Sequence, residues 1–161
     1  MKKTMVLAVA IFIGLFIMMY LPDRLTLFSV KPDLLLLVAI FSTIYLRKKQ
    51  GMAFACCAGL IKDVIGVASF GINALSFFTC SLCVKKLVKF IYGERVFEQI
   101  VFVFIIAMIN SSIVALLSLF SFRLQVSGLI FLKGFIESTY TAVLSPIAFS
   151  LMKRCVPKYS F

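Results

Sequence analysis

Four polar residues interrupt long apolar stretches of the sequence, and their types are those that could carry chemistry: Lys62, Asp63, Asn110 and Glu137. At the centre of a membrane helix, a charged side chain costs about 2.5–3.5 kcal/mol on insertion scales. Such residues usually form either a proton or substrate pathway or a set of contacts that locks helices together. A proton relay often includes His, and the chain has none. The sequence therefore favours a structural lock.

The positions of these residues along their helices suggest a common depth. Asp63 lies about 12 residues, roughly 18 Å, from the start of its helix, and Glu137 about 10 residues, roughly 15 Å, from the opposite membrane face. In a hydrocarbon core about 30 Å thick, both fall near the middle or in the outer half, as does Asn110. We therefore predict a polar layer made of these three residues and Lys62. Glu137 would pair with Lys62 or with Lys133, which lies one helical turn before it.

The cysteines offer a second possible chemistry, because Cys80 and Cys83 form a C-x-x-C pattern. In a soluble loop this pattern indicates redox or metal chemistry. Within an apolar segment, and without His or a second C-x-x-C, it favours small buried thiols in the reduced state. The sequence shows no metal-ligand cluster, no phosphate-binding loop and no nucleophile beside a base. We predict no catalytic, cofactor-binding or metal-binding residues, and a protein that is not an enzyme.

The composition places these residues in a membrane. Of 161 residues, 63% are hydrophobic, against about 45–50% apolar residues in soluble domains. The apolar residues form blocks of about 20, the length that crosses a bilayer. The net charge of +11 would suggest nucleic acid in a soluble protein. Here the basic residues flank the apolar blocks, which is typical of membrane topology, so we predict no nucleic-acid partner.

The apolar blocks predict an all-α integral membrane protein that forms a single transmembrane domain over residues 1–161. The first block is longer than a usual signal-peptide core and lacks an A-x-A site, so we expect it to be retained. Pro32 and Asp33 open the second helix, where a proline and a negative charge are both favoured. Pro146 is expected to kink the last helix. The six predicted helices span approximately residues 5–21, 33–46, 51–70, 73–91, 97–120 and 127–152.

The distribution of Lys and Arg predicts the orientation, because cytoplasmic loops are enriched in these residues. With the N-terminus in the cytoplasm, the inside regions hold the basic clusters at 2–3, 47–49, 85–95 and 153–158. The outer loops then hold only Arg24, Lys31 and Arg123. Five spans would put one basic cluster outside. The sequence therefore predicts six spans with both termini inside.

Small residues at four-residue spacing predict close helix contacts. Gly51, Ala55 and Gly59 repeat at this spacing in the third helix, where we favour packing within the protein. Ala10 and Gly14 repeat it in the first helix. There the pattern fits internal packing and partner docking equally well.

Two stretches resemble the bacterial rod shape-determining MreD family. The first is Lys31–Leu37, which contains the proline-aspartate start of the second helix. The second is Gly51–Leu75, with a glycine-bearing helix, an intramembrane aspartate and a Gly-x-Asn-Ala-Leu sequence that opens the next helix. Lys62 departs from the family pattern, which usually has an apolar residue beside the aspartate. The expected turn and packing residues are Pro32, Asp33, Gly51, Ala55, Gly59, Gly66, Gly71 and Asn73.

The resemblance implies a non-enzymatic scaffold of the cell-elongation (rod) complex in the bacterial cytoplasmic (inner) membrane. The implied partners are MreC, the MreB filament, and the glycosyltransferase and transpeptidase that build side-wall peptidoglycan. The family is similar in architecture to the substrate-binding (S) subunits of energy-coupling-factor vitamin transporters. The basic inside loops would contact the filament or the headgroups of anionic membrane lipids.

An S subunit is the alternative function. In that case Ala10 and Gly14 would dock to the transporter, and the polar layer would form a ligand site. The chain has no Trp and no His, and its outer loops are short, which leaves little material to enclose a vitamin.

Overall fold

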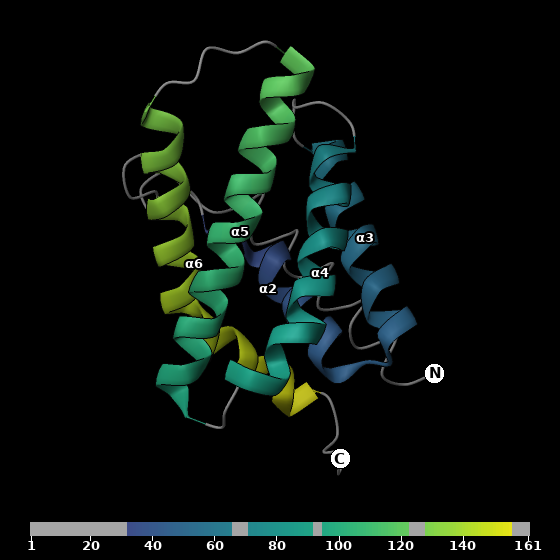
Figure 1. Cartoon of the computed structure of the whole chain (residues 1–161). Coiled ribbons are helices and arrows are strands. Elements are labelled where there is room, and N and C mark those ends of the chain that lie inside the picture. The colour runs from purple at the N-terminus through teal and green to yellow at the C-terminus, as the bar shows by residue number, and fades with distance from the viewer. Residues whose placement is uncertain (1–31, 66–70, 92–94, 123–127, 156–161) are drawn as a thin grey trace.

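The computed structural model describes residues 32–65, 71–91, 95–122 and 128–155, and these segments are all-helical (Figure 1). The predicted helix at 5–21, with Ala10 and Gly14, lies outside the described residues, as does Gly66. The described helices are α2 (Leu34–Tyr45), α3 (Lys48–Ile65), α4 (Ile72–Ile91), α5 (Val96–Phe122) and α6 (Gly128–Cys155).

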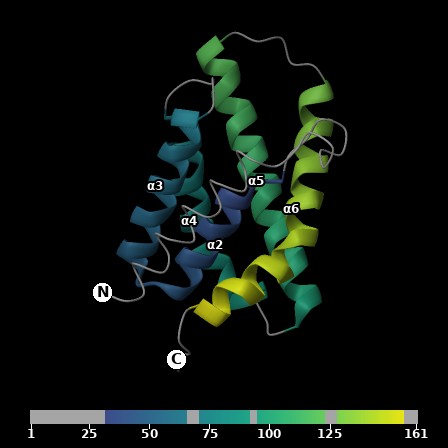
Figure 2. The same ribbon diagram turned by 180° about the vertical axis from the view of Figure 1, so that it is seen from behind.

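The longer helices run alternately up and down. Figures 1 and 2 show α3 and α5 running in one direction, and α4 and α6 in the other. Short connections favour such antiparallel neighbours. α3 packs against α4 and α2, α5 packs against α6, and α4 packs against α5. This order brings residues from distant parts of the sequence together around α2.

α2 is the central helix of the described bundle. Every residue from Leu35 to Thr43 is buried, whereas a surface helix would show a polar, exposed face. The ring of Phe41 lies 5.4 Å from that of Phe149 on α6. With 12 residues, α2 is about 18 Å long at 1.5 Å per residue. It is therefore shorter than a hydrocarbon core of about 30 Å and counts among the shorter apolar helices, so a span at the predicted helix 33–46 has to include residues that flank α2.

Two described helices are long and apolar enough to cross a membrane. The candidate spans are Val96–Ser118 in α5 and Leu132–Met152 in α6, and only 28% and 33% of an apolar 18-residue window in each is buried. The core helix of a soluble protein would be mostly buried. These exposed apolar surfaces are therefore suited to contact lipid.

α6 contains Pro146, and its C-terminal part changes direction relative to the rest of the helix (Figure 2). Proline has no backbone N–H, so the carbonyl of Ala142 loses its usual donor. The Ser145 hydroxyl donates to that carbonyl at 2.7 Å. The lost backbone hydrogen bond is thus replaced within the helix.

The described basic clusters gather at one end of the bundle. The C-terminal ends of α2, α4 and α6 and the N-terminal ends of α3 and α5 lie together, at the bottom of Figure 1. The 47–49 cluster joins α2 to α3, and Arg95 precedes α5. Lys85 donates to the carbonyl of Leu46 at 3.0 Å, which ties α4 to the end of α2. Charge on one side is the pattern that the positive-inside rule describes.

Candidate functional site

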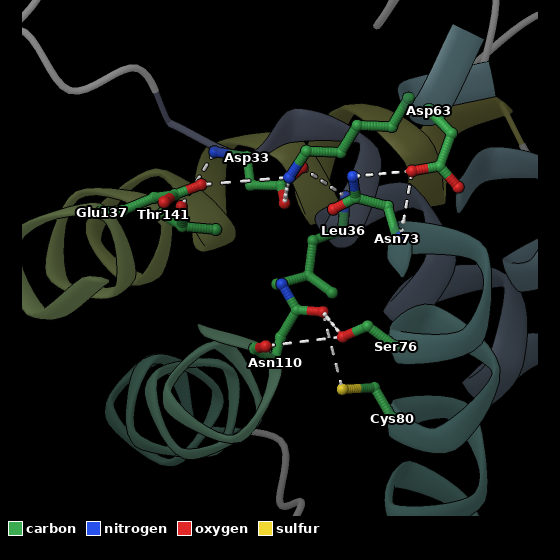
Figure 3. Close-up of polar contacts among 10 residues, drawn as sticks. Asp33, Leu36, Asp63, Asn73, Ser76, Cys80, Asn110, Glu137 and Thr141 are labelled. Carbon is green, nitrogen blue, oxygen red and sulfur yellow. Dashed lines mark hydrogen bonds and ion pairs between the residues drawn. The ribbon is translucent and has the colours of Figure 1, made fainter. Parts of the chain in front are cut away.

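Asp63 lies on the last turn of α3 and caps the start of α4 (Figure 3). Its Oδ2 atom accepts the backbone N–H groups of Gly71 and Ala74, both at 3.0 Å. Its Oδ1 atom accepts the backbone N–H of Asn73 at 3.0 Å and the side-chain amide of Asn73 at 2.9 Å. The first N–H groups of a helix lack partners within it, and its N-terminus favours a negative charge. Asp63 meets both requirements from the neighbouring helix.

Glycines let α3 approach this helix start closely. A Cβ atom on Gly59 would lie 2.6 Å from both the Cα of Ala74 and the carbonyl oxygen of Asn73. Gly59 is one turn before Asp63, so both face the start of α4. Gly71 has a φ of +99°, a conformation that residues with side chains rarely adopt. These features form one joint between α3 and α4.

The other small residues of α3 pack within the bundle. A Cβ atom on Gly51 would lie 2.9 Å from the Cα of Thr43 on α2. Ala55 is fully buried. The small-residue face of α3 therefore lies between α2 and α4, the internal position that we favoured from the sequence.

Lys62 is directed toward α2 and α6 rather than toward its neighbour Asp63. Its Nζ atom pairs with Oδ2 of Asp33 and lies 4.0 Å from Oε1 of Glu137. The same atom lies 5.5 Å from the centre of the Phe77 ring on α4, within cation–π range. Of the two lysines considered for Glu137, Lys62 makes the contact, whereas Lys133 is exposed. Lys62 thus connects α3 to the start of α2 and to α6.

Asp33 fixes where α2 begins. Its Oδ1 atom accepts the N–H of Leu36 at 3.0 Å, the hydrogen bond of a helix N-cap. Its own backbone N–H donates to the Thr141 hydroxyl at 3.0 Å. Thr141 lies one turn after Glu137, in the middle part of α6. α2 therefore starts inside the bundle, which explains its short length.

Asn110 belongs to a separate set of contacts between α4 and α5. The Ser76 hydroxyl donates to Oδ1 of Asn110 at 2.6 Å, and the Cys80 sulfur lies 3.8 Å from the same oxygen (Figure 3). Within the described residues, the contacts of Asn110 are therefore separate from those of Lys62, Asp63 and Glu137, and their common depth stays a prediction. Cys80 and Cys83 are both free thiols.

Sequence reasoning missed three members of the site: Thr141, Ser76 and Phe77. Thr141 lies 108 residues from Asp33 in sequence, and no local pattern indicates such a pairing. The sequence offers one indication that Thr141 belongs to the site: it lies one turn after Glu137, on the same face of the helix. Ser76 has a similar signal, since it lies one turn after Asn73.

These contacts form interhelical locks. Every buried side-chain nitrogen and oxygen in the described part of the chain has a hydrogen-bond partner. Polar contacts of this kind average under about 1 kcal/mol each in membranes, but they fix how helices are aligned. Among the described residues, no group of His, Cys, Asp and Glu could hold a metal ion.

Comparison with known proteins gives one match. The sequence model of the family described as rod shape-determining protein MreD matches residues 1–155. No curated protein and no solved structure matches the chain.

Proposed function

The chain belongs to the MreD family of rod shape-determining proteins, and we propose that it is a non-enzymatic membrane scaffold of the bacterial cell-elongation complex. The family is membrane-associated, has a role in rod shape determination and is not known as an enzyme family. In the proposed role, the chain binds MreC directly. It thereby helps to organise side-wall peptidoglycan synthesis with the MreB filament, the glycosyltransferase and the transpeptidase.

The family match over residues 1–155 is the observation that carries this proposal. The described contacts add support, because they join helices and leave long apolar faces on α5 and α6 for lipid or for other membrane helices. A scaffold needs a fixed shape and a surface for partners.

We also propose six spans with both termini in the cytoplasm of the bacterial inner membrane. The alternating directions of α3 to α6 and the basic clusters at one end of the bundle support this topology. The helix predicted at 5–21 would supply a further span. The architecture similar to S subunits remains a prediction.

The test is purification of the tagged protein in mild detergent from its native membranes, followed by mass spectrometry of the proteins that co-purify. An unrelated multi-span protein with the same tag is the control. We expect enrichment of MreC and of wall-synthesis enzymes over that control. Recovery of ATPase subunits with a transmembrane coupling protein would instead identify a transporter subunit and contradict the scaffold function.

A further inference from the structure

The cluster of Asp33, Lys62 and Glu137 carries more negative than positive charge. Asp33 accepts a backbone hydrogen bond from Leu36 and pairs directly with Lys62. Glu137 has only the Lys62 contact at 4.0 Å among the interactions of the described residues, which is longer than a hydrogen bond. Asp63, by comparison, accepts four hydrogen bonds, one from Gly71 just before α4 and three from Asn73 and Ala74 in its first turn. One lysine therefore serves two carboxylates, and Glu137 is the less well compensated.

The excess charge lies on the accessible side of the cluster. The side chain of Glu137 is 33% exposed, against 17% for Lys62 and 2% for Asp33. A carboxylate that faces hydrocarbon without a close partner is costly. Glu137 also lies within the candidate span Leu132–Met152. It therefore needs a further partner from outside the described contacts.

The surface around Glu137 is distinct from the side of α6 that packs on α5. On that side, the ring of Phe135 lies 5.7 Å from the ring of Phe104, and a Cβ on Gly134 would lie 3.1 Å from Cβ of Ser111. Glu137 lies on the neighbouring flank of the helix, which is directed toward Lys62 on α3. Lys133 lies one turn before it, and the half-buried Leu144 lies two turns after it.

Charge decides which occupant fits this flank. A second copy would bring its own excess negative charge to the interface, which is repulsive. The predicted helix at 5–21 contains no charged residue, so it supplies no compensating charge. A helix with a Lys or Arg inside its apolar stretch would complete the cluster. In the same chain, Arg24, Lys31 and the exposed Lys133 are the competing sources of positive charge.

We propose that the flank of α6 around Glu137 binds a transmembrane helix of a partner protein, and that a Lys or Arg on that helix pairs with the Glu137 carboxylate. This inference rests on the proposed function, because it supplies the contact by which the scaffold holds a membrane partner.

The test compares partner recovery by tagged wild type, Glu137→Gln and Glu137→Lys. Glu98→Gln is the matched control, since Glu98 is half-buried on the first turn of α5, at the basic end of the bundle. We expect at least a tenfold loss of the partner for Glu137→Gln, complete loss for Glu137→Lys, and no change for the control. Glu137→Gln should fold normally, because Lys62 still forms its ion pair with Asp33. Yield and a single size-exclusion peak check this point.

A charge swap identifies the pairing. The Lys or Arg in the apolar stretch of the recovered partner is changed to Glu and combined with Glu137→Lys. Restored recovery supports the inference. Recovery by Glu137→Gln equal to wild type would overturn it while the scaffold function stands. A swap that fails, together with partner loss for Arg24→Gln, Lys31→Gln or Lys133→Gln, would show that Glu137 pairs with a residue of its own chain. That result would also overturn the inference. If wild type recovers no membrane partner, the proposed function fails, and the inference fails with it.

Discussion

At the residue scale, Lys62 and Asp63 are adjacent and oppositely charged, yet they serve different helices. Asp63 caps α4, while Lys62 pairs with Asp33 at the start of α2 and approaches Glu137 on α6. Neighbours in a helix point about 100° apart, so they do not face each other. The last turn of α3 therefore holds α2, α4 and α6 in place through two consecutive side chains.

Replacing Asp63 tests whether its role is structural. Asp63→Leu leaves the N–H groups of Gly71, Asn73 and Ala74 without an acceptor, at about 1–3 kcal/mol for each unpaired buried group. We expect a much lower folded yield in detergent, measured by size-exclusion chromatography of a fluorescent fusion. Asp63→Asn keeps one acceptor oxygen, so it should fall between Leu and wild type and still recover partners.

One result would contradict the structural role of Asp63. If both variants were produced at wild-type yield and only Asp63→Asn lost its partners, the carboxylate would act in binding. Thr139→Val is a suitable control, because Thr139 is exposed and its hydroxyl bonds only within α6.

Removing Lys62 should be more harmful than removing the whole ion cluster. Lys62→Met leaves Asp33 and Glu137 as uncompensated carboxylates, and breaking a buried pair in this way costs about 3–5 kcal/mol. Adding Asp33→Asn and Glu137→Gln removes both charges and keeps polar groups of the same shape. We expect the triple variant to regain most of the thermal stability in detergent. A triple variant less stable than Lys62→Met would show that the carboxylates stabilise the protein by other contacts.

At the element scale, the closest helix contact is that of α3 with the start of α4. Gly59→Ala places a methyl group 2.6 Å from backbone atoms of Asn73 and Ala74, so the helices must separate. Overpacking of this kind costs about 1–3 kcal/mol. It also moves Asp63 away from the N–H groups that it caps. We expect a lower melting temperature in detergent.

Gly134→Ala is the matched control for Gly59→Ala. Its nearest neighbour is the side chain of Ser111 at 3.1 Å, and alanine favours helix over glycine by about 1 kcal/mol. We expect its melting temperature to stay close to that of wild type. Equal effects of the two substitutions would show that the backbone contact of Gly59 is not limiting.

The sequence predicted element ends well where a local signal marks them. α4, α5 and α6 begin within one residue of their predicted starts, since loops with polar or glycine residues precede them. α3 begins at Lys48, three residues before the expected start at Gly51. The basic run there was interpreted as a stop signal between spans, although Lys is also a good helix former. Helix propensity therefore extended α3 through the charges.

The candidate site was less predictable than the helices. Composition and depth indicated which polar residues need partners, but not their directions. Asp33 was expected only as a helix start, and its contacts with Lys62 and Thr141 span 29 and 108 residues. Such pairings depend on how helices pack, which the period of one segment does not encode. The contacts of Asn110 with Ser76 and Cys80 on α4 could not be predicted for the same reason.

At the scale of the whole molecule, the basic residues distinguish the two ends of the bundle. Arg47, Lys49 and Arg95 lie at one end, with the starts of α3 and α5. Insertion keeps short, positively charged loops in the cytoplasm. We therefore propose that the charged end faces the cytoplasm.

Cysteine labelling tests this orientation directly. In a variant whose native cysteines are changed to serine or alanine, single cysteines replace Lys49, Arg95 or Arg123. A membrane-impermeant maleimide added to intact cells should label the Arg123→Cys variant, because that loop lies outside in the predicted topology. The Lys49→Cys and Arg95→Cys variants should react only after the inner membrane is permeabilised, because a thiol on the cytoplasmic side is shielded by the bilayer. Labelling of Lys49→Cys or Arg95→Cys in intact cells would show the opposite topology. The basic end would then lie outside the cytoplasm, where a cytoplasmic filament could not contact it.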